Sequence, residues 1–328
     1  MDIKAFFSRK NTLLAQCVAL AVWAWVIFFT GKLPDFVANG FVVPTMLAGS
    51  FVAGSTSEGG GAVAFPVMTL FFNIKPAVAR DFSLMIQSVG MCCAGYYIYR
   101  KGVPVARRLL AVSLAGCFVG QVVAFKFIDG YFLPVVLKIS FASIWMGFAL
   151  VMIPRLKDAG GHYSSDIIAR SRVAYLVAFF LAIVGGVVTA LIGTGADIIM
   201  FSFAVLVLNI SEKVATPTSV VLMGLGSLMG VAIKSTLVPG GFSPEALDYW
   251  LVGVPAAMIG APLGARVASR VSRRVIIVLL QISIMIQFVF AWVILPLTLQ
   301  QKMLSIGLLV SFIMVFHVLS GWGRRARW

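Results

Sequence analysis

The stretch AGSTSEGGGAVAFPVM, residues 53–68, combines a carboxylate, several hydroxyls and four glycines inside a strongly apolar part of the chain. Its polar centre consists of Ser55, Thr56, Ser57, Glu58, Gly59, Gly60 and Gly61. In a soluble protein such a Gly-rich polar stretch is typical of a surface loop. The long apolar runs on both sides of it indicate instead that the chain is broken at membrane depth.

Composition places the chain in a membrane. Its 328 residues are 61% hydrophobic and only 11% charged, whereas a soluble domain carries roughly 25% charged residues. Apolar runs of about 20 residues, the length that crosses a bilayer as a helix, recur along the whole sequence. We therefore predict an all-α polytopic membrane protein. The predicted full spans are residues 12–31, 80–98, 107–126, 132–153, 214–236, 247–268, 274–296 and 303–320.

Two regions, residues 41–73 and 173–209, do not fit a single span. Each is more than 30 residues of mostly apolar sequence and is interrupted near its middle by polar, Gly-rich residues, GSTSEGGG in the first and IGTGAD in the second. A bilayer needs only about 20 helical residues to cross it. Each region is therefore predicted to form two helices, either as two crossings or as a hairpin that enters the membrane and returns.

Basic residues predict the sidedness of the spans. Most of the 26 Lys and Arg residues lie before the first span, in the connections around 100–108, 155–172 and 266–274, and in the C-terminal tail. The other connections carry about one each: Lys32, Lys126, Lys234 and Lys302. The net charge of +15 is thus expected to report topology rather than nucleic-acid binding. The positive-inside rule predicts cytoplasmic termini in a cell inner membrane, with about eight transmembrane helices plus two broken or re-entrant hairpins.

The two halves of the chain resemble each other weakly. An offset of 136 residues places Asn73 on Asn209 and Gly59 on Gly195, so that the two polar breaks coincide, and a four-residue insertion extends the match. Because the matching spans run in opposite directions, the halves are predicted to be inverted repeats, as in many secondary transporters. The predicted segments are 1–40 with an uncleaved first helix, 41–153 as repeat 1, 154–172 as a cytoplasmic linker, 173–298 as repeat 2, and 299–328 with the last helix and basic tail.

The two breaks predict a site for a small anion. Irregular chain at membrane depth survives only where it lines a cavity or packs on protein. Helices restarting near Ala62 and Ile198 would point their positive N-terminal ends into such a cavity. The alternative is that the glycines only allow close helix packing. The candidate substrate-binding residues are Ser55, Thr56, Ser57, Gly59, Gly60, Gly61, Arg80, Ser83, Gly193, Thr194, Gly195, Thr216, Thr218 and Ser219.

Three acids are candidates for proton coupling: Glu58, Asp197 and Asp81. A charged group at membrane depth is costly and usually functional. An ionised carboxylate beside an anion site repels the anion, so that protonation and anion binding would favour each other. Asp197 has an alternative use as a helix cap. Arg80 is predicted to clamp an oxyanion with Asp81 as its resting partner, the alternative being an ion pair at the membrane surface.

No metal or cofactor site is expected. The four cysteines, Cys17, Cys92, Cys93 and Cys117, lie in apolar runs and are expected to be small buried side chains. His162 and His317 are far apart in the sequence, and nothing resembles a nucleotide-binding loop.

The motifs resemble the TauE/SafE family of sulfite and organosulfonate exporters. The resemblance rests on GSTSEGGGAVAFPVMTLFFNIKPAVA, YYIYRKGV and VTALIGTGAD…NISEKVATPTSV, and covers residues 41 to about 320. It implies a duplicated polytopic carrier of small sulfur-containing anions. One departure is the sequence Arg80-Asp81-Phe82-Ser83, where members of the family usually carry a Thr-Ser pair.

The sequence and the resemblance together predict a secondary transporter that moves sulfite or an organosulfonate by alternating access, as proton-coupled export. Its expected partners are the small anion and the lipid bilayer, with a homo-oligomer possible and no nucleic acid. Two alternatives stay open. A passive anion channel would use the same breaks, and an intramembrane sulfur-handling enzyme would use Cys92 and Cys93.

Overall fold

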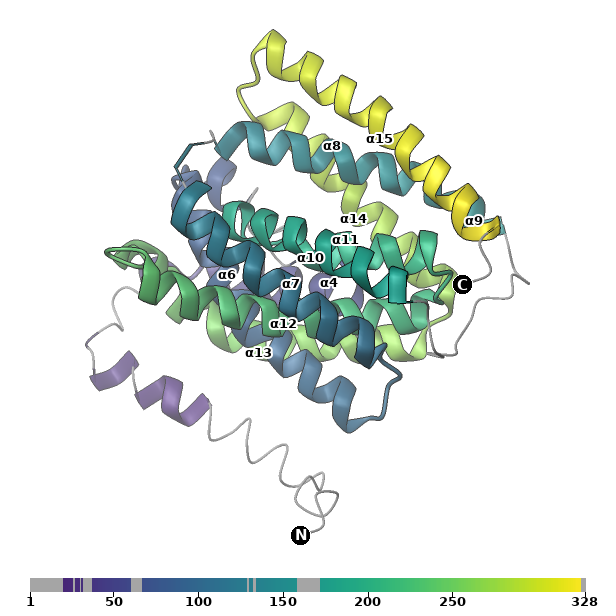
Figure 1. Ribbon diagram of the computed structural model, residues 1–328. Helices are drawn as coiled ribbons and strands as arrows, with labels where there is room; N and C mark the ends of the chain where they lie inside the picture. The colour runs from purple at the N-terminus through teal and green to yellow at the C-terminus, as the bar shows by residue number, and fades with distance from the viewer. Residues whose placement is uncertain are drawn as a thin grey trace.

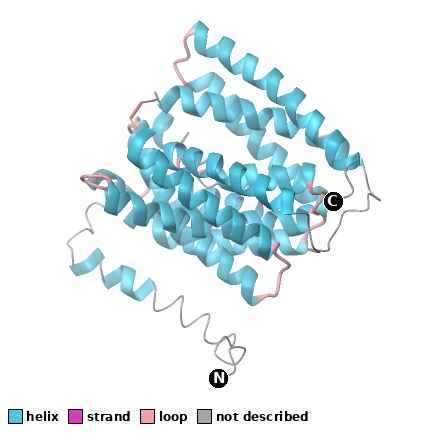
Figure 2. Ribbon diagram, in the orientation of Figure 1, coloured by secondary structure: helices cyan, strands magenta, loops and turns pink. Residues whose placement is uncertain are grey.

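The computed structural model describes residues 20–25, 27–29, 31, 37–59, 67–128, 130–131, 134–157 and 172–325. These residues form helices and connections without a β-strand, which confirms the predicted all-α class (Figure 2). The elements in chain order are α4 (Val42–Ser55), η1 (Val67–Phe71), α6 (Pro76–Arg100), α7 (Arg107–Val123), η2 (Ala124–Ile128), α8 (Pro134–Met152), α9 (Pro154–Lys157), α10 (Arg172–Ile192), α11 (Ala196–Ser202), η3 (Phe203–Val207), α12 (Glu212–Leu237), α13 (Pro244–Arg270), α14 (Arg273–Ile294) and α15 (Leu299–Arg325), where η marks a π-helical segment.

Seven described helices are long and apolar enough to cross a membrane. They are Arg107–Ile128, Val135–Met152, Arg172–Ile192, Glu212–Leu237, Pro244–Arg270, Arg273–Ile294 and Leu299–Gly321. Six of them match predicted spans, whereas half of the predicted span 12–31 lies outside the described residues. The seventh, α10, forms the first half of the second broken region, so this region consists of one full-length helix followed by a shorter one, Ala196–Val207.

The prediction that residues 80–98 form an ordinary apolar span needs correction. The segment lies within the 25-residue helix α6, but α6 is not among the seven candidate spans. The physical reason is that polar residues lower the hydropathy of α6. Asp81, Ser83 and Gln87 lie on this helix, and all three are buried. α12 and α13 pack along this helix. α6 is thus a central helix whose polar groups face protein rather than lipid.

Serine caps set where three of the long helices begin. Ser211, Ser243 and Ser272 precede α12, α13 and α14, and each side chain accepts a hydrogen bond from a backbone N–H of the first turn. Such caps satisfy donors that the start of a helix leaves without a partner.

α6 and α12 form an antiparallel pair at the centre of the bundle. Asp81 near the start of α6 contacts Lys234 near the end of α12, and the backbone of Met91 lies against Gly224 midway along both helices. α13 packs on α4 and α6, α10 packs on α7, and α8 packs on α14 and α15. α15 runs along one edge of the bundle in Figure 1, and few of its residues are buried within the protein.

Glycines allow two other helix pairs to approach backbone to backbone. A Cβ atom built on Gly264 of α13 would lie 2.1 Å from the carbonyl oxygen of Phe51 in α4. On the other side of the bundle, a Cβ on Gly120 of α7 would lie 2.0 Å from the carbonyl oxygen of Ile183 in α10. Both pairs therefore require glycine at the crossing, as small residues do in membrane helix packing generally.

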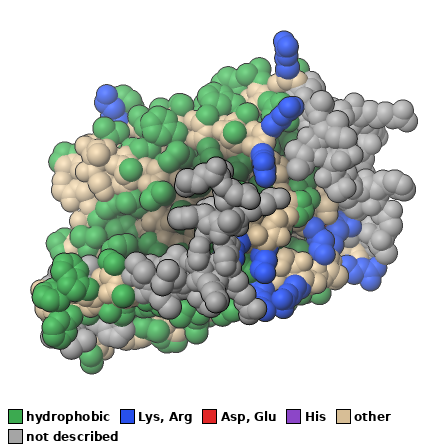
Figure 3. Space-filling model, turned by 90° about the horizontal axis from the view of Figure 1, so that it is seen from below, with side chains coloured by type: hydrophobic (Ala, Val, Ile, Leu, Met, Phe, Trp, Pro, Cys, Tyr) green, Lys and Arg blue, Asp and Glu red, His purple; other side chains and the backbone are tan. Residues whose placement is uncertain are grey.

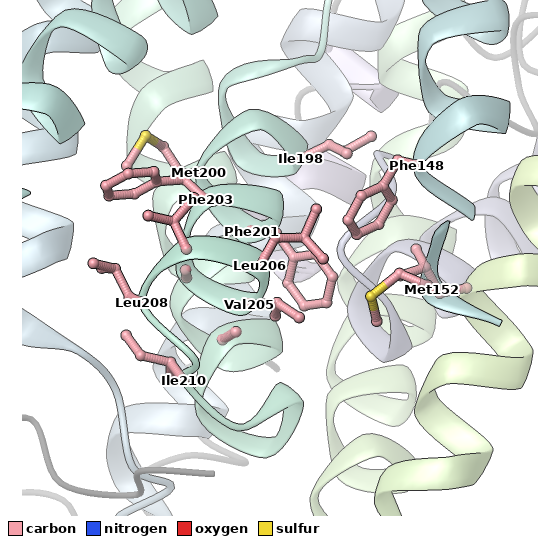
Figure 4. Packing of buried hydrophobic residues seen from close by; sticks show 14 of the residues in the cluster. Phe148, Met152, Ile198, Met200, Phe201, Phe203, Val205, Leu206, Leu208 and Ile210 are labelled. Carbon is pink, nitrogen blue, oxygen red and sulfur yellow. The ribbon is translucent and has the colours of Figure 1, made fainter. Parts of the chain in front are cut away.

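The short helix after the second break is held in a dense apolar core. Ile198 and Phe201 of α11, and Val205 and Leu206 of η3, are buried in one cluster with Phe148 of α8 (Figure 4). This packing fixes the chain that follows the break and leaves the break itself as the polar end of the element.

Most visible Lys and Arg side chains gather toward one end of the molecule in Figure 3, while hydrophobic side chains cover much of the remaining surface in this view. An end rich in basic groups and an apolar flank are what a bilayer-spanning bundle presents.

Candidate functional site

The first break begins where α4 ends at Ser55. The hydroxyls of Ser55 and Thr56 both donate to the carbonyl oxygen of Val52, at 3.0 and 2.9 Å, and the Thr56 N–H donates to the same oxygen. The Thr56 hydroxyl also accepts the N–H of Glu58 at 3.2 Å. Two of the predicted anion donors therefore hold the end of the helix, since helix ends leave carbonyl groups that need partners.

The second break turns on two glycines. Gly193 and Gly195 have φ angles of 92° and 149°, which side-chain-bearing residues rarely adopt. The carboxylate of Asp197 accepts the Gly195 N–H at 2.9 Å and the hydroxyl of Thr194 at 3.3 Å. Asp197 lies in the first turn of α11, whose N-cap is Gly195, and it is thus bonded to the backbone and side chain of its own turn.

The two breaks meet at the middle of α6. A Cβ atom on Gly59 would lie 2.3 Å from the hydroxyl oxygen of Thr194 and 3.2 Å from the side-chain nitrogen of Gln87. The same Gln87 nitrogen donates to the carbonyl oxygen of Gly193 at 3.1 Å and to the hydroxyl of Ser83 at 2.9 Å. We call this meeting place the tip site: the first break at 55–59, the second break at 193–197, and Ser83 and Gln87 of α6.

Several buried polar atoms of the tip site have no hydrogen-bond partner within the described part of the chain. They are both carboxylate oxygens of Glu58, the Ser57 hydroxyl and the side-chain oxygen of Gln87. Glu58 is fully buried, and Ser57 and Gln87 are almost so. Buried polar atoms normally find partners, and a buried charge without one is costly. The tip site is therefore suited to receive a proton and a polar ligand.

Sequence reasoning missed a cation beside this site. Lys138 of α8 is buried, and it lies close enough to Glu58 for the two charges to interact. Glu58 also interacts electrostatically with Asp197. The available signal was a single lysine within the predicted span 132–153, because charged residues inside a span are seldom accidental. Gln87 was missed because its side chain carries no charge and so gives no comparable signal.

Arg80 and Asp81 form an ion-paired cluster with a third residue. Asp81 contacts Arg80 at 3.2 Å and Lys234 of α12 at 2.5 Å, and the Lys234 ammonium lies 5.0 Å from the ring centre of Phe242. Lys234 was expected in an outer connection, but the structure buries it within α12. This correction follows from Asp81, which gives the buried ammonium a partner. The backbone of Arg80 adjoins Gly193, so the cluster borders the tip site.

The three candidate hydroxyl residues of α12, Thr216, Thr218 and Ser219, differ from one another in their hydrogen bonds. Thr218 donates to the carbonyl oxygen of Val214 at 2.6 Å and accepts the N–H of Ala106 at 2.9 Å, which fixes the start of α7. Ser219 donates to the carbonyl oxygen of Thr216, whereas the buried Thr216 hydroxyl has no partner among the described residues. Gly60 and Gly61 lie outside the described residues.

The described cysteines are unpaired thiols. Cys92 and Cys93 are partly buried on α6, and Cys117 is buried on α7. Over the described ranges no group of three His, Cys, Asp or Glu side chains is placed to hold a metal ion.

Comparison with known proteins gives one match. A family model described as "Sulfite exporter TauE/SafE" matches residues 42–291, from the start of α4 to near the end of α14. Neither the search of curated proteins nor the search of solved structures found a match.

Proposed function

The chain belongs to the TauE/SafE sulfite exporter family, and from this premise we propose that it binds sulfite or an organosulfonate at the tip site and exports it by alternating access. Members of this family are membrane transporters and not enzymes. The protein is accordingly a multi-pass membrane transporter. The proposal concerns the substrate, the direction of transport and the coupling of transport to protons.

The observation that carries the proposal is the convergence of two Gly-rich breaks on polar residues of α6. The Gly59 backbone lies against Thr194, and Gln87 binds the carbonyl of Gly193. The Ser57 hydroxyl, which has no hydrogen-bond partner in the described part of the chain, would donate to an oxyanion there. A small tetrahedral or pyramidal anion suits such a site because glycine lets a ligand approach the backbone closely.

Inverted repeats would let one site open to either side. Several features of the two halves support this architecture at the offset of 136 residues. The π-helical segments η1 and η3 correspond, as do α6 and the matching part of α12, which run antiparallel. Asn73 and Asn209 both have positive φ, at 52° and 49°. The hydrogen bond from the Ile74 N–H to Met68, 3.0 Å, corresponds to the one from Ile210 to Ala204, 2.9 Å.

The packing of the outer helices supports the same architecture. Gly120 of α7 crosses Ile183 of α10, and the corresponding Gly260 of α13 crosses Leu47 of α4. Each repeat would thus contribute one helix to each crossing. Motion of one crossed pair against the other around the tip site is the usual route to alternating access in such proteins.

Glu58 is our choice for the proton-coupling group. Its oxygens have no hydrogen-bond partner among the described residues, whereas Asp197 is bonded to its own turn and Asp81 is ion-paired with Lys234. A sulfite dianion that moves with one proton keeps a net negative charge. The inside-negative potential of an inner membrane, worth about 2.3 kcal/mol per elementary charge at 100 mV, then favours its export. The proposal also places the N- and C-termini of the chain in the cytoplasm.

The proposal is tested by flux into proteoliposomes. Purified protein would be reconstituted and uptake of sulfite, sulfate, thiosulfate and ethanesulfonate measured with and without a pH gradient. We expect sulfite or ethanesulfonate to move, with a flux that changes when the gradient is imposed. A flux that does not change when the pH gradient is imposed would indicate a passive channel. If none of the four anions moves, the proposed substrate class is contradicted.

A further inference from the structure

The carboxylates of the tip site are not neutralised by Arg80, the cation that the sequence predicts for it. The site contains the fully buried Glu58 and the buried Asp197, which interact with each other electrostatically. Two carboxylates repel an anionic substrate. Arg80, the predicted clamp, is already paired with Asp81, which is also bound to Lys234. An anion site here therefore needs a cation from another element.

Lys138 is placed to be this cation. It lies on α8 one helical turn before Phe141, whose ring is 3.4 Å from the position that a Cβ atom would take on Gly195. Residues three apart share a helix face, so Lys138 lies on the face that packs against the second break. It is buried, and its charge interacts with that of Glu58 in the first break. Lys138 therefore adjoins both halves of the tip site.

The other charged groups on the helices around α8 do not compete for this role. Among the described residues, Glu58 and Asp197 are the acids of the tip site, and the buried Cys117 of α7 lies near Asp197 as a neutral thiol. On α14, Arg273 is paired with Glu212. The remaining charged residues on α10, α14 and α15 are exposed or lie at helix ends: Arg172, Arg274, Lys302, His317, Arg324 and Arg325.

We propose that Lys138 binds the substrate oxyanion in the tip site and that Glu58 competes with the anion for it. When Glu58 is ionised, its carboxylate and Lys138 compensate each other and the anion is excluded. When Glu58 takes up a proton, the anion replaces the Glu58 carboxylate as a counter-charge of Lys138, so that one proton and one anion occupy the site together. The inference rests on the proposed function, and it names the residue and the exchange that the function requires.

The test measures equilibrium binding to purified protein by calorimetry. Ethanesulfonate is the main probe because its charge is fixed across the pH range used, and sulfite is compared with it. The variants are Lys138→Met, Lys138→Arg, Glu58→Gln and the double variant Glu58→Gln/Lys138→Met. Lys126→Met is the control, because Lys126 is exposed on η2 and its loss removes the same charge elsewhere.

We expect wild-type protein to bind the probe more tightly as the pH falls. Lys138→Met should weaken binding by about tenfold or more, the loss typical of a hydrogen bond to a charged group. Lys138→Arg should retain most of the affinity, and Lys126→Met should match wild type. Glu58→Gln should bind ethanesulfonate more tightly than wild type at high pH, where the wild-type carboxylate is ionised, and its affinity should change less with pH than the wild-type affinity does.

The double variant separates binding from structure. If Lys138 only neutralises Glu58, removing both charges should restore the affinity, and this result would overturn the proposal. If Lys138 binds the anion, the double variant should still bind the probe weakly. Its melting temperature would show that it nevertheless folds. Wild-type affinity in Lys138→Met would refute the role of Lys138 and leave the proposed function intact. Failure of wild-type protein to bind either probe would contradict the proposed function itself.

Discussion

Asp81 and Lys234 show how a single buried charge depends on its partner. Their ion pair joins α6 to α12, and Lys234 is only 3% exposed. Asp81→Asn would remove the carboxylate that the buried ammonium contacts, and breaking a buried pair in this way costs about 3–5 kcal/mol. We expect a lower melting temperature in detergent for this variant. The double variant Asp81→Asn/Lys234→Met should recover much of the loss, because it removes both charges. A double variant as unstable as the single one would contradict this account.

Gly59 carries a second prediction at the residue scale. A methyl group in its place would meet the Thr194 hydroxyl at 2.3 Å and press the two breaks apart. We expect Gly59→Ala to reduce anion flux strongly in proteoliposomes. Gly95→Ala is the matched control, because a Cβ atom there would have its nearest neighbour at 3.6 Å. Equal flux in both variants would mean that the breaks need not touch for transport.

At the residue scale, sequence reasoning found the two breaks but not all of the tip site. The glycines and hydroxyls of 55–59 and 193–195 were predicted because they interrupt apolar runs. Lys138 and Gln87 were missed because each is a single polar residue inside a helix, and only the fold brings them to the breaks. The pairing of Asp81 with Lys234 joins residues 153 positions apart, which no local pattern indicates.

At the scale of elements, the crossing of α7 and α10 depends on backbone contact at Gly120. A Cβ atom there would lie 2.0 Å from the carbonyl oxygen of Ile183, so the two helices would have to separate. We expect Gly120→Ala to destabilise the protein by about 1–3 kcal/mol, the usual penalty for overpacking. Thermal unfolding in detergent measures this, with Gly226→Ala as control, since its nearest neighbour would be a side-chain sulfur at 3.5 Å. Equal stability of the two variants would contradict a backbone crossing.

The elements themselves were predictable to different degrees. The spans of α7, α8 and α12 to α15 followed from the length of their apolar runs, because a bilayer sets that length. α6 departed from this pattern since its polar side chains are covered by neighbouring helices, so that its surroundings rather than its own composition keep it in place. The unequal lengths of α10 and the helix after it were not predictable, because the break alone does not say how far each arm continues.

At the scale of the whole molecule, the topology can be read by chemical labelling. Lys101 lies in the α6–α7 connection and Pro239 in the α12–α13 connection, and both are exposed. We expect a cysteine at Pro239 to react with a membrane-impermeant thiol reagent in intact cells. A cysteine at Lys101 should react only after permeabilisation, because the basic connections are assigned to the cytoplasm. Wild-type protein gives the background labelling, and the reverse pattern would invert the proposed topology.

The central claim is that one sulfur oxyanion binds where the two breaks meet on α6. The most direct measurement is anomalous diffraction from crystals soaked in selenite, the selenium analogue of sulfite. We predict a selenium peak at the tip site, within hydrogen-bonding reach of Ser57 and beside Glu58 and Lys138, that is reduced by competing sulfite. A peak elsewhere, or an empty tip site in protein that transports sulfite, would contradict the account.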